Sequence, residues 1–296
     1  MWVIKYRKVF YALTIFIVLA SILSLGIFRL NLGIDFTGGT LWEVKFLGQR
    51  PGMEQVQNTL VSIGLEPSVT QPTGSDGFIM RFRPLDETQH QAALAALGKD
   101  FGAIEELQFN AIGPSIGKEL RDKAIYAIVF SILAVIAYIA WSFRKVEKVI
   151  SSWAYGVFTI VAMAHDVLLP LGVFAILGKF YHVEITSVFV AAILTIAGYS
   201  INDTIVVFDR VRENLRRHTH DNFSELVAAS LKQTLARSLN TTITTILALV
   251  AIYIFGGEST KSFALALLIG IISGAYSSIF IASPLLVTWS LRKNRE

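Results

Sequence analysis

The fold is decided by the stretch Gly198-Tyr-Ser-Ile-Asn-Asp-Thr-Ile-Val-Val-Phe-Asp-Arg210, which places Asp203 inside the long apolar run Ile185–Phe208. A carboxyl group on a segment that crosses a bilayer costs roughly 2.5–3.5 kcal/mol on insertion scales. Acids in such segments usually face the interior of a helix bundle and often take part in moving protons or ions. Asp203 is therefore the first candidate functional residue of this chain.

The composition is that of a membrane protein with several spans. Of the 296 residues, 53% are hydrophobic and 16% are charged, whereas soluble domains carry about 25% charged residues. Six nearly uncharged runs each have close to the ~20 residues that cross a bilayer. These predicted spans are Val9–Phe28, Ala124–Phe143, Trp153–Leu177, Ile185–Phe208, Leu239–Phe255 and Phe263–Leu285. The first is predicted to be a retained span and not a signal peptide, because no small-x-small cleavage site ends it.

Lysine and arginine residues predict the orientation of the spans. With the N-terminus inside, the inside segments hold 15 of the 26 basic residues, among them Arg144 and Lys145. The two short outside loops hold only Lys179 and Lys261. Because basic residues in short loops stay in the cytoplasm, both termini are predicted to be cytoplasmic and residues 29–123 periplasmic. The net charge of +4 follows from this distribution, so no nucleic-acid partner is expected. The absence of cysteine excludes disulfides and thiolate metal sites.

The segment between the first two spans predicts a small α+β domain. Four short apolar runs predict strands at Leu41–Leu47, Glu66–Gln71, Phe78–Phe82 and Ile104–Ile112. Apolar residues at helical spacing predict helices at Met53–Ile63 and Asp86–Lys99. The order βαββαβ indicates a ferredoxin-like fold. The one histidine of this segment, His90, is interpreted as an exposed residue without metal-ligand spacing around it. The domain is therefore expected to bind a chain or a partner domain.

The loop Asp209–Ser238 is polar and basic, and its apolar residues repeat at helical spacing. These residues are Phe223, Leu226, Val227, Leu231 and Leu235. Two interpretations stay open. One is an ordinary basic loop with a short helix, and the other is an amphipathic helix that lies at the inner membrane surface and binds acidic lipids or a partner.

Polar side chains in the fourth and fifth spans predict a charged pair. Asp203 shares a polar helix face with Tyr199, and Arg237 opens the fifth span with Thr241 and Thr245 one and two turns further along. Asp203 and Arg237 both lie near the inner ends of their spans, so their depths match. A guanidinium nearby stabilises a carboxylate while burial destabilises it, and these opposing effects suit a switchable proton site. The alternatives are an acid that only holds helices together and an arginine that only anchors its span.

Three further motifs lie elsewhere in the chain. His165-Asp166 falls midway along the third span, where it is a proton-relay member, a partner for Arg237 or a packing hydrogen bond near a kink. Gly270-Ile-Ile-Ser-Gly274 has the small-xxx-small spacing of close helix approach, which is packing and not chemistry. Asp35-Phe-Thr-Gly-Gly-Thr40 predicts a tight turn after the first span.

Together these motifs resemble those of the SecF family of protein-export membrane proteins. The stretch Gly33–Thr40 resembles the family's opening signature, and Ile112–Leu120 resembles its entry to the second span. His165-Asp166, Gly198–Asn214 and Arg237–Thr245 resemble its third, fourth and fifth spans. The resemblance covers the whole chain, and the fourth-span stretch is long and specific.

The resemblance implies a function as well as a fold. SecF proteins belong to the RND superfamily and pair with SecD in a twelve-span unit. That unit associates with the SecYEG channel and YajC, acts after the ATPase SecA, and draws on the proton gradient to help preproteins leave the bacterial inner membrane. No enzymatic activity and no cofactor are implied, the expected transported ion is H⁺ with Na⁺ as an alternative, and membrane lipids surround the chain. The resemblance implies that Asp203 and Arg237 occupy the family's proton-pathway positions. The proton pathway predicted for this chain consists of Asp203, Arg237, Asp166, His165, Asn202, Thr241 and Thr245. The implied signature turn consists of Asp35, Phe36, Thr37, Gly38 and Gly39.

The expected organisation is a first span at residues 1–29, a periplasmic α+β domain at 30–120, and a five-helix transmembrane domain at 121–296 with a cytoplasmic loop at 209–238. One rival function is a small-molecule exporter of the same superfamily, which needs larger outside domains. A second is a non-transporting scaffold of the export machinery. An intramembrane hydrolase needs a nucleophile–base set that the sequence lacks.

Overall fold

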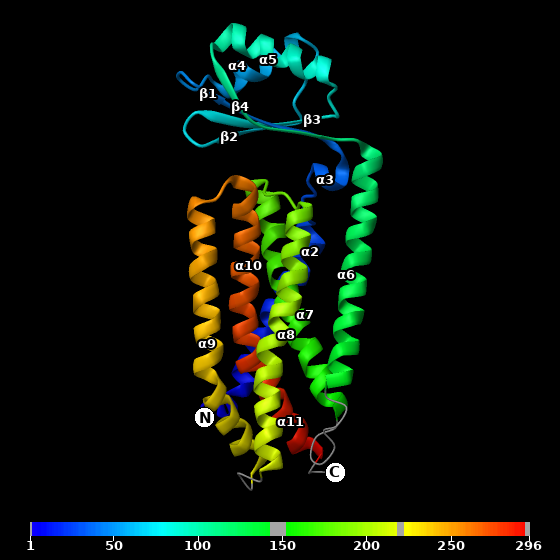
Figure 1. Ribbon diagram of the computed structural model, residues 1–296, viewed down its shortest axis with the longest axis vertical. Coiled ribbons are helices and arrows are strands. Elements are labelled where there is room, and N and C mark those ends of the chain that lie inside the picture. The colour runs from blue at the N-terminus through cyan, green and yellow to red at the C-terminus, as the bar shows by residue number, and fades with distance from the viewer. Residues whose placement is uncertain (1, 143–151, 218–221, 294–296) are drawn as a thin grey trace. The chain divides into compact units, whose positions relative to one another are not determined.

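The computed structural model describes residues 2–142, 152–217 and 222–293 (Figure 1). The chain divides into two compact units. The helical unit consists of Met1–Asn31 and Tyr126–Glu296, and the sheet unit consists of Leu32–Ile125. Each unit has an apolar core of its own. The predicted inside residues Arg144 and Lys145 lie outside the described residues.

Among the residues that the structure describes, six helices are long and apolar enough to cross a membrane, which confirms the six predicted spans. The long helices are α2 (Arg7–Phe28), α6 (Pro114–Ser142), α7 (Ser152–Tyr181), α8 (Ser187–Arg216), α9 (Phe223–Phe255) and α10 (Glu258–Ser277). The shorter elements of the helical unit are α1 (Trp2–Lys5), the π-helix η1 (Ser278–Ala282) and α11 (Ser283–Lys293). The sixth predicted span is therefore not one regular helix, because η1 interrupts it.

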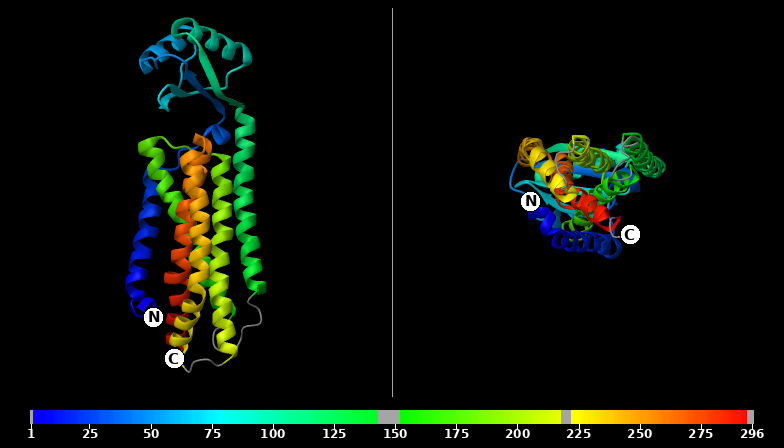
Figure 2. Two further views of the ribbon diagram at one scale, coloured as in Figure 1. Left: turned by 60° about the vertical axis from the view of Figure 1, so that its left-hand side comes forward. Right: turned by 90° about the horizontal axis from the view of Figure 1, so that it is seen from below.

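The centre of the helical unit is formed by α7, α8 and α10. Between 44% and 61% of the apolar stretches of the third, fourth and sixth spans is buried, against 6–17% for α2, α6 and α9. In both views of Figure 2, α6 stands at the edge of the bundle. A helix that is buried on most sides can hold polar groups away from both water and lipid, so α7, α8 and α10 are the elements that can build an internal site.

The predicted loop helix is instead the beginning of α9. Helix α9 starts at Phe223 and continues without a break to Phe255, because no glycine or proline interrupts this stretch. Its apolar stripe, including Leu226 and Leu231, packs against Val3 and Val211 in a buried cluster. Both earlier interpretations are therefore wrong for these residues, since the stripe neither ends as a short loop helix nor lies on a membrane surface. Residues 218–221 of the same loop lie outside the described ranges.

The sheet unit has the predicted element order βαββαβ. Its elements are β1 (Gly39–Phe46), α4 (Met53–Ser62), β2 (Val69–Thr73), β3 (Gly77–Phe82), α5 (Glu87–Phe101) and β4 (Ile104–Ile112). The strands form one antiparallel sheet in the order β2-β3-β1-β4. Trp42, Val44 and Phe46 alternate along β1 into the core, as a half-buried strand requires. Helix α5 starts where predicted, because the Asp86 side chain accepts a hydrogen bond from the Gln89 backbone N–H.

The prediction that His90 is exposed is wrong. His90 belongs to α5, and its buried side chain faces β4, where its Nε2 lies 2.5 Å from Oε2 of Glu106. The same carboxylate oxygen accepts a hydrogen bond of 2.7 Å from Nε1 of Trp42, and the imidazole stacks on the ring of Phe109. His90 is three residues before Ala93, which faces the core from the same helix face. That spacing was the sequence signal for burial.

Candidate functional site

Asp203 lies on the buried face of α8 and is only 4% exposed. This face also carries Ile196, Ser200 and Val207 at helical spacing, so α8 packs it against neighbouring helices. Asp203 Oδ2 is buried, and no described residue forms a hydrogen bond with it. The structure therefore places one oxygen of this carboxyl group in a buried position without a donor from the described residues, which is a costly arrangement for a permanently charged acid.

A second buried acid, Asp166 of α7, is fully surrounded by donors. Ser200 and Ser277 donate to its Oδ2 at 2.5 and 2.6 Å, and Ser273 donates to its Oδ1 at 2.7 Å. His165 Nδ1 lies 2.9 Å from the same Oδ1. An ionised carboxylate has about four lone-pair positions. Asp166 has four partners, so this cluster joins α7, α8 and α10 through one carboxyl group.

The close approach of α10 to α8 depends on the Gly270–Gly274 motif. A Cβ atom added at Gly270 lies 2.4 Å from side-chain atoms of Ile196, and one added at Gly274 lies 3.4 Å from Cα of Ser200. The predicted packing role of this motif is confirmed. However, Ser273 lies within the motif and Ser277 follows it by one turn. The same helix face therefore also supplies two hydrogen-bond donors to Asp166. Serine four residues after serine, beside the glycines, was the signal that the sequence analysis missed.

The π-helix η1 continues this polar interface. Ser278, its first residue, shares a hydrogen bond of 2.9 Å with Thr204, which directly follows Asp203 on α8. The Ser283 hydroxyl donates to the Ser278 carbonyl at 2.8 Å, a bond across five residues. π-Helical turns inside longer helices often occur at functional sites. The interruption of the last span thus lies close to both acids along the chain. Ser278 bonds to the residue that follows Asp203, and Ser277, directly before η1, bonds to Asp166.

Asp203 and Arg237 do not form the predicted ion pair in this structure. Arg237 is exposed and lines a polar pocket of about 420 Å³ together with Asp209, Glu213 and Gln233. The two groups lie on adjacent helices without contact, because α9 presents Arg237 to the open side of α8 while Asp203 points to the packed side. His165-Asp166 does not contact Arg237 either, since its partners are serines of α8 and α10.

The remaining predicted pathway residues lie on exposed or partly exposed helix faces. Asn202 and Thr241 are exposed, and Thr245 is partly buried. The Thr241 hydroxyl donates to the Arg237 carbonyl at 2.8 Å, and the Thr245 hydroxyl donates to the Thr241 carbonyl at 2.8 Å. Such bonds to the preceding helical turn satisfy the hydroxyls locally. The structure thus separates a buried group, formed by His165, Asp166 and Asp203, from an open group on α8 and α9.

The predicted glycine turn belongs to the sheet unit. Asp35, Phe36 and Thr37 lie in the short helix α3 (Ile34–Thr37), and Gly38 and Gly39 follow with φ of 73° and 130°. These angles suit glycine, since other residues adopt them at a cost. A Cβ added at Gly38 lies 2.8 Å from Cα of Pro114, and one added at Gly117 lies 2.7 Å from the Gly38 nitrogen. The turn therefore packs directly on the first turns of α6.

Comparisons with known proteins agree with this arrangement. The family model of the C-terminal part of the protein-export membrane proteins SecD and SecF matches residues 92–292, and the model of their GG motif matches residues 23–46. The chain belongs to the SecD/SecF family. The first match includes the fourth span with Asp203, and the second includes the Gly38–Gly39 turn. The family is one of multi-pass membrane proteins, as the six spans require.

Proteins named as translocase subunit SecF are similar to this chain over nearly its whole length. It is 44% identical to the protein translocase subunit SecF of Thermobaculum terrenum over 97% of this chain and 93% of that protein. It is 38% identical to SecF of Desulfurispirillum indicum over 95% and 89% of the two chains. The crystal structure of SecDF from Thermus thermophilus, a translocon-associated membrane protein, matches 99% of this chain with a TM-score of 0.84 and 33% identity. The chain spans only 38% of that SecDF chain.

Proposed function

We propose that this chain is the SecF subunit of a SecD–SecF complex that promotes export of preproteins across a bacterial inner membrane. Relatives named as translocase subunit SecF match nearly their whole length, which supports a transport role and not a catalytic one. The similarity to about two-fifths of a SecDF chain supports SecD as the partner that supplies the rest. SecYEG, YajC and SecA are proposed as further partners on the family resemblance.

The orientation belongs to the same proposal. Both termini and the loop 209–238 face the cytoplasm, and the sheet unit, a ferredoxin-like domain, faces the periplasm. The basic residues of the inside segments support this orientation. Within the proposed domains at 1–29, 30–120 and 121–296, ion movement takes place in the helical domain and preprotein contact at the periplasmic one.

Ion coupling is proposed at Asp203, and the observation that carries it is the buried, unpartnered Oδ2 of that residue. An ionised Asp203 gains from the approach of Arg237, whereas a protonated Asp203 needs no cation. Protonation therefore favours one arrangement of α8 and α9 over another. One charge moving through 100 mV carries roughly 2.3 kcal/mol, which biases a two-state equilibrium more than tenfold. The transported ion is H⁺ in this proposal, with Na⁺ as the alternative, and no cofactor takes part.

Replacement of Asp203 by Asn tests this proposal in membrane vesicles that contain the assembled export machinery. We expect Asp203→Asn to keep co-purification with SecD and to remove the part of preprotein export that depends on the ion gradient. Glu225→Gln is the matched control, because Glu225 is an exposed acid in the first turn of the adjacent helix α9 and lines none of the pockets described. Undiminished gradient-dependent export by an assembled Asp203→Asn complex would contradict the proposal.

A further inference from the structure

Helix α6 leaves an open groove beside α8. Only 6% of its apolar stretch is buried, the lowest share among the six spans. Val135 and Ile139 pack against the core of the helical unit, whereas Phe130, Leu133 and Tyr138 of the same helix are exposed. A span attached to its bundle by so few side chains leaves space along its length, and in a membrane that space is filled by something apolar.

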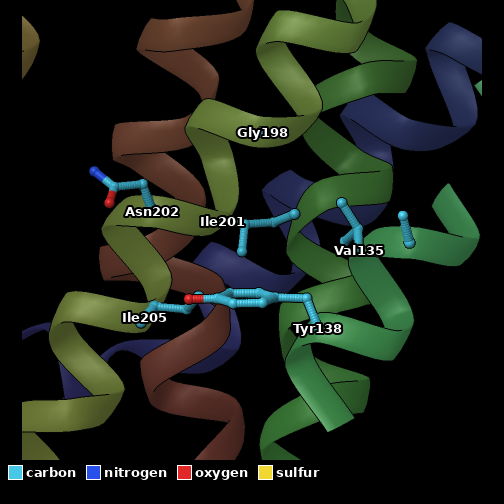
Figure 3. Close-up of a pocket in the computed structure, with 7 residues that line it drawn as sticks. Val135, Tyr138, Gly198, Ile201, Asn202 and Ile205 are labelled. Atoms are coloured by element: carbon cyan, nitrogen blue, oxygen red, sulfur yellow. The ribbon is translucent and has the colours of Figure 1, made fainter. Parts of the chain in front are cut away.

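The groove has a volume of about 400 Å³ and is lined mainly by apolar side chains. Val135 and Tyr138 line it from α6, and Gly198, Ile201 and Ile205 line it from α8. Figure 3 shows Ile201 extending from α8 toward Val135 and Tyr138 extending from α6 toward Ile205, while Asn202 points away from α6. A Cβ at Gly198 meets no atom within 4 Å, so the glycine leaves this wall open. A helix of about 10 Å diameter does not fit a space of this size, but a hydrocarbon chain does.

One end of the groove leads to a basic pocket. A second pocket of about 450 Å³ shares Ile205 with the groove and is lined by Trp141, Asp209, Arg212 and Arg216. Arg212 and Arg216 are four residues apart and therefore lie on one face of α8. Asp209 is 3.6 Å from Arg212 and offsets part of its charge. Arg212 and Arg216 thus bring two guanidinium groups, each with five N–H donors, to this end of the groove.

The order of these groups along α8 matches a phospholipid. Guanidinium groups bind phosphate oxygens, tryptophan prefers the level of the lipid headgroups, and the apolar groove continues from there into the span. We propose that the groove between α6 and α8 binds one anionic phospholipid, with an acyl chain between Ile201 and Tyr138 and the headgroup phosphate at Arg212 and Arg216. The lipid completes the contact that α6 does not make with the bundle.

Native mass spectrometry of the full chain, stripped of lipid and then incubated with phosphatidylglycerol or phosphatidylcholine, tests this proposal. We expect one retained phosphatidylglycerol per chain and weaker retention of phosphatidylcholine. The double variant Arg212→Gln/Arg216→Gln is expected to lose phosphatidylglycerol about tenfold, as two basic contacts to an anionic headgroup imply. The charge-matched control Arg217→Gln/Arg292→Gln removes two arginines that line neither pocket and should bind as the parent does.

A second variant tests the acyl-chain part without touching the charges. Gly198→Phe places a ring in the groove, so retention of both lipids should fall while the protein keeps its thermal stability. Equal binding of the two lipids, or equal loss in the control double variant, contradicts the proposal. A photo-crosslinking residue at position 138 decides the occupant, because capture of a protein helix instead of a lipid also overturns it.

Discussion

Asp166 and Asp203 are both buried acids in the helical unit, yet their surroundings differ in kind. Three serine hydroxyls and a histidine surround Asp166, which leaves its carboxylate saturated with donors. Asp203 has a buried oxygen without a partner among the described residues, and Arg237 of the adjacent helix does not contact it. The comparison teaches that a buried charge alone does not mark a switch. A saturated acid holds helices together, and an unsaturated acid can change its state at small structural cost.

Removal of each carboxylate is the strongest way to break this comparison. Asp166→Ala leaves three hydroxyls and one imidazole without their acceptor, so we expect the free energy of unfolding to fall by roughly 2–4 kcal/mol, at about 0.6–1 kcal/mol for each lost interaction. Asp203→Ala removes no observed hydrogen bond at Oδ2 and should cost about 1 kcal/mol or less. Unfolding in increasing denaturing detergent measures both. Equal losses for the two variants would show that the saturation of Asp166 does not stabilise the fold.

Glycine substitutions compare the packed and open faces of α8. Gly270→Ala forces a Cβ into Ile196 of the packed face, and overpacking of this kind costs roughly 1–3 kcal/mol. Gly198→Ala is the matched control on the open face, where a Cβ meets nothing and the better helix propensity should stabilise by up to about 1 kcal/mol. Thermal unfolding of the two variants should therefore shift in opposite directions. A stable Gly270→Ala protein would mean that α10 and α8 approach less closely than described.

A single hydroxyl sharpens the account of the saturated cluster. Ser277→Ala removes one of the donors to Asp166, with an expected loss of roughly 0.6–1.7 kcal/mol, the range for hydrogen bonds between membrane helices. Thr244→Ala is the control, because this exposed hydroxyl bonds only to its own preceding helical turn. The same detergent unfolding assay resolves the two. Identical behaviour of the variants would imply that the other donors replace Ser277 without cost.

The elements with local signals were predicted well. Apolar runs long enough to span a bilayer gave all six spans, and alternation with turn residues gave the order of strands and helices in the sheet unit. The start of α5 was predictable because Asp86 caps it through neighbouring atoms. The failures concern which faces meet. His90 is buried because α5 turns it onto β4, and the stripe after Phe223 is buried because α1 and α8 cover it.

Only part of the candidate site could be predicted from the sequence, because the sequence does not determine which helix faces meet. An acid in an apolar run stands out, so Asp203 and Asp166 were found. Ser273 and Ser277 did not stand out, because serine is common in spans and its role depends on the helix opposite. The separation of Asp203 from Arg237 follows from the rotation of α8 relative to α9, which matching depth along two spans does not determine.

The most direct test of the central claim is a pH titration by difference infrared spectroscopy of the complex in lipid membranes. The claim predicts a protonated-carboxyl band that appears and disappears with pH in the parent protein, is absent in Asp203→Asn, and persists in Asp166→Asn. A titrating band that survives in Asp203→Asn but is lost in Asp166→Asn would contradict the account, because the saturated acid and not the unpartnered one would then change its charge.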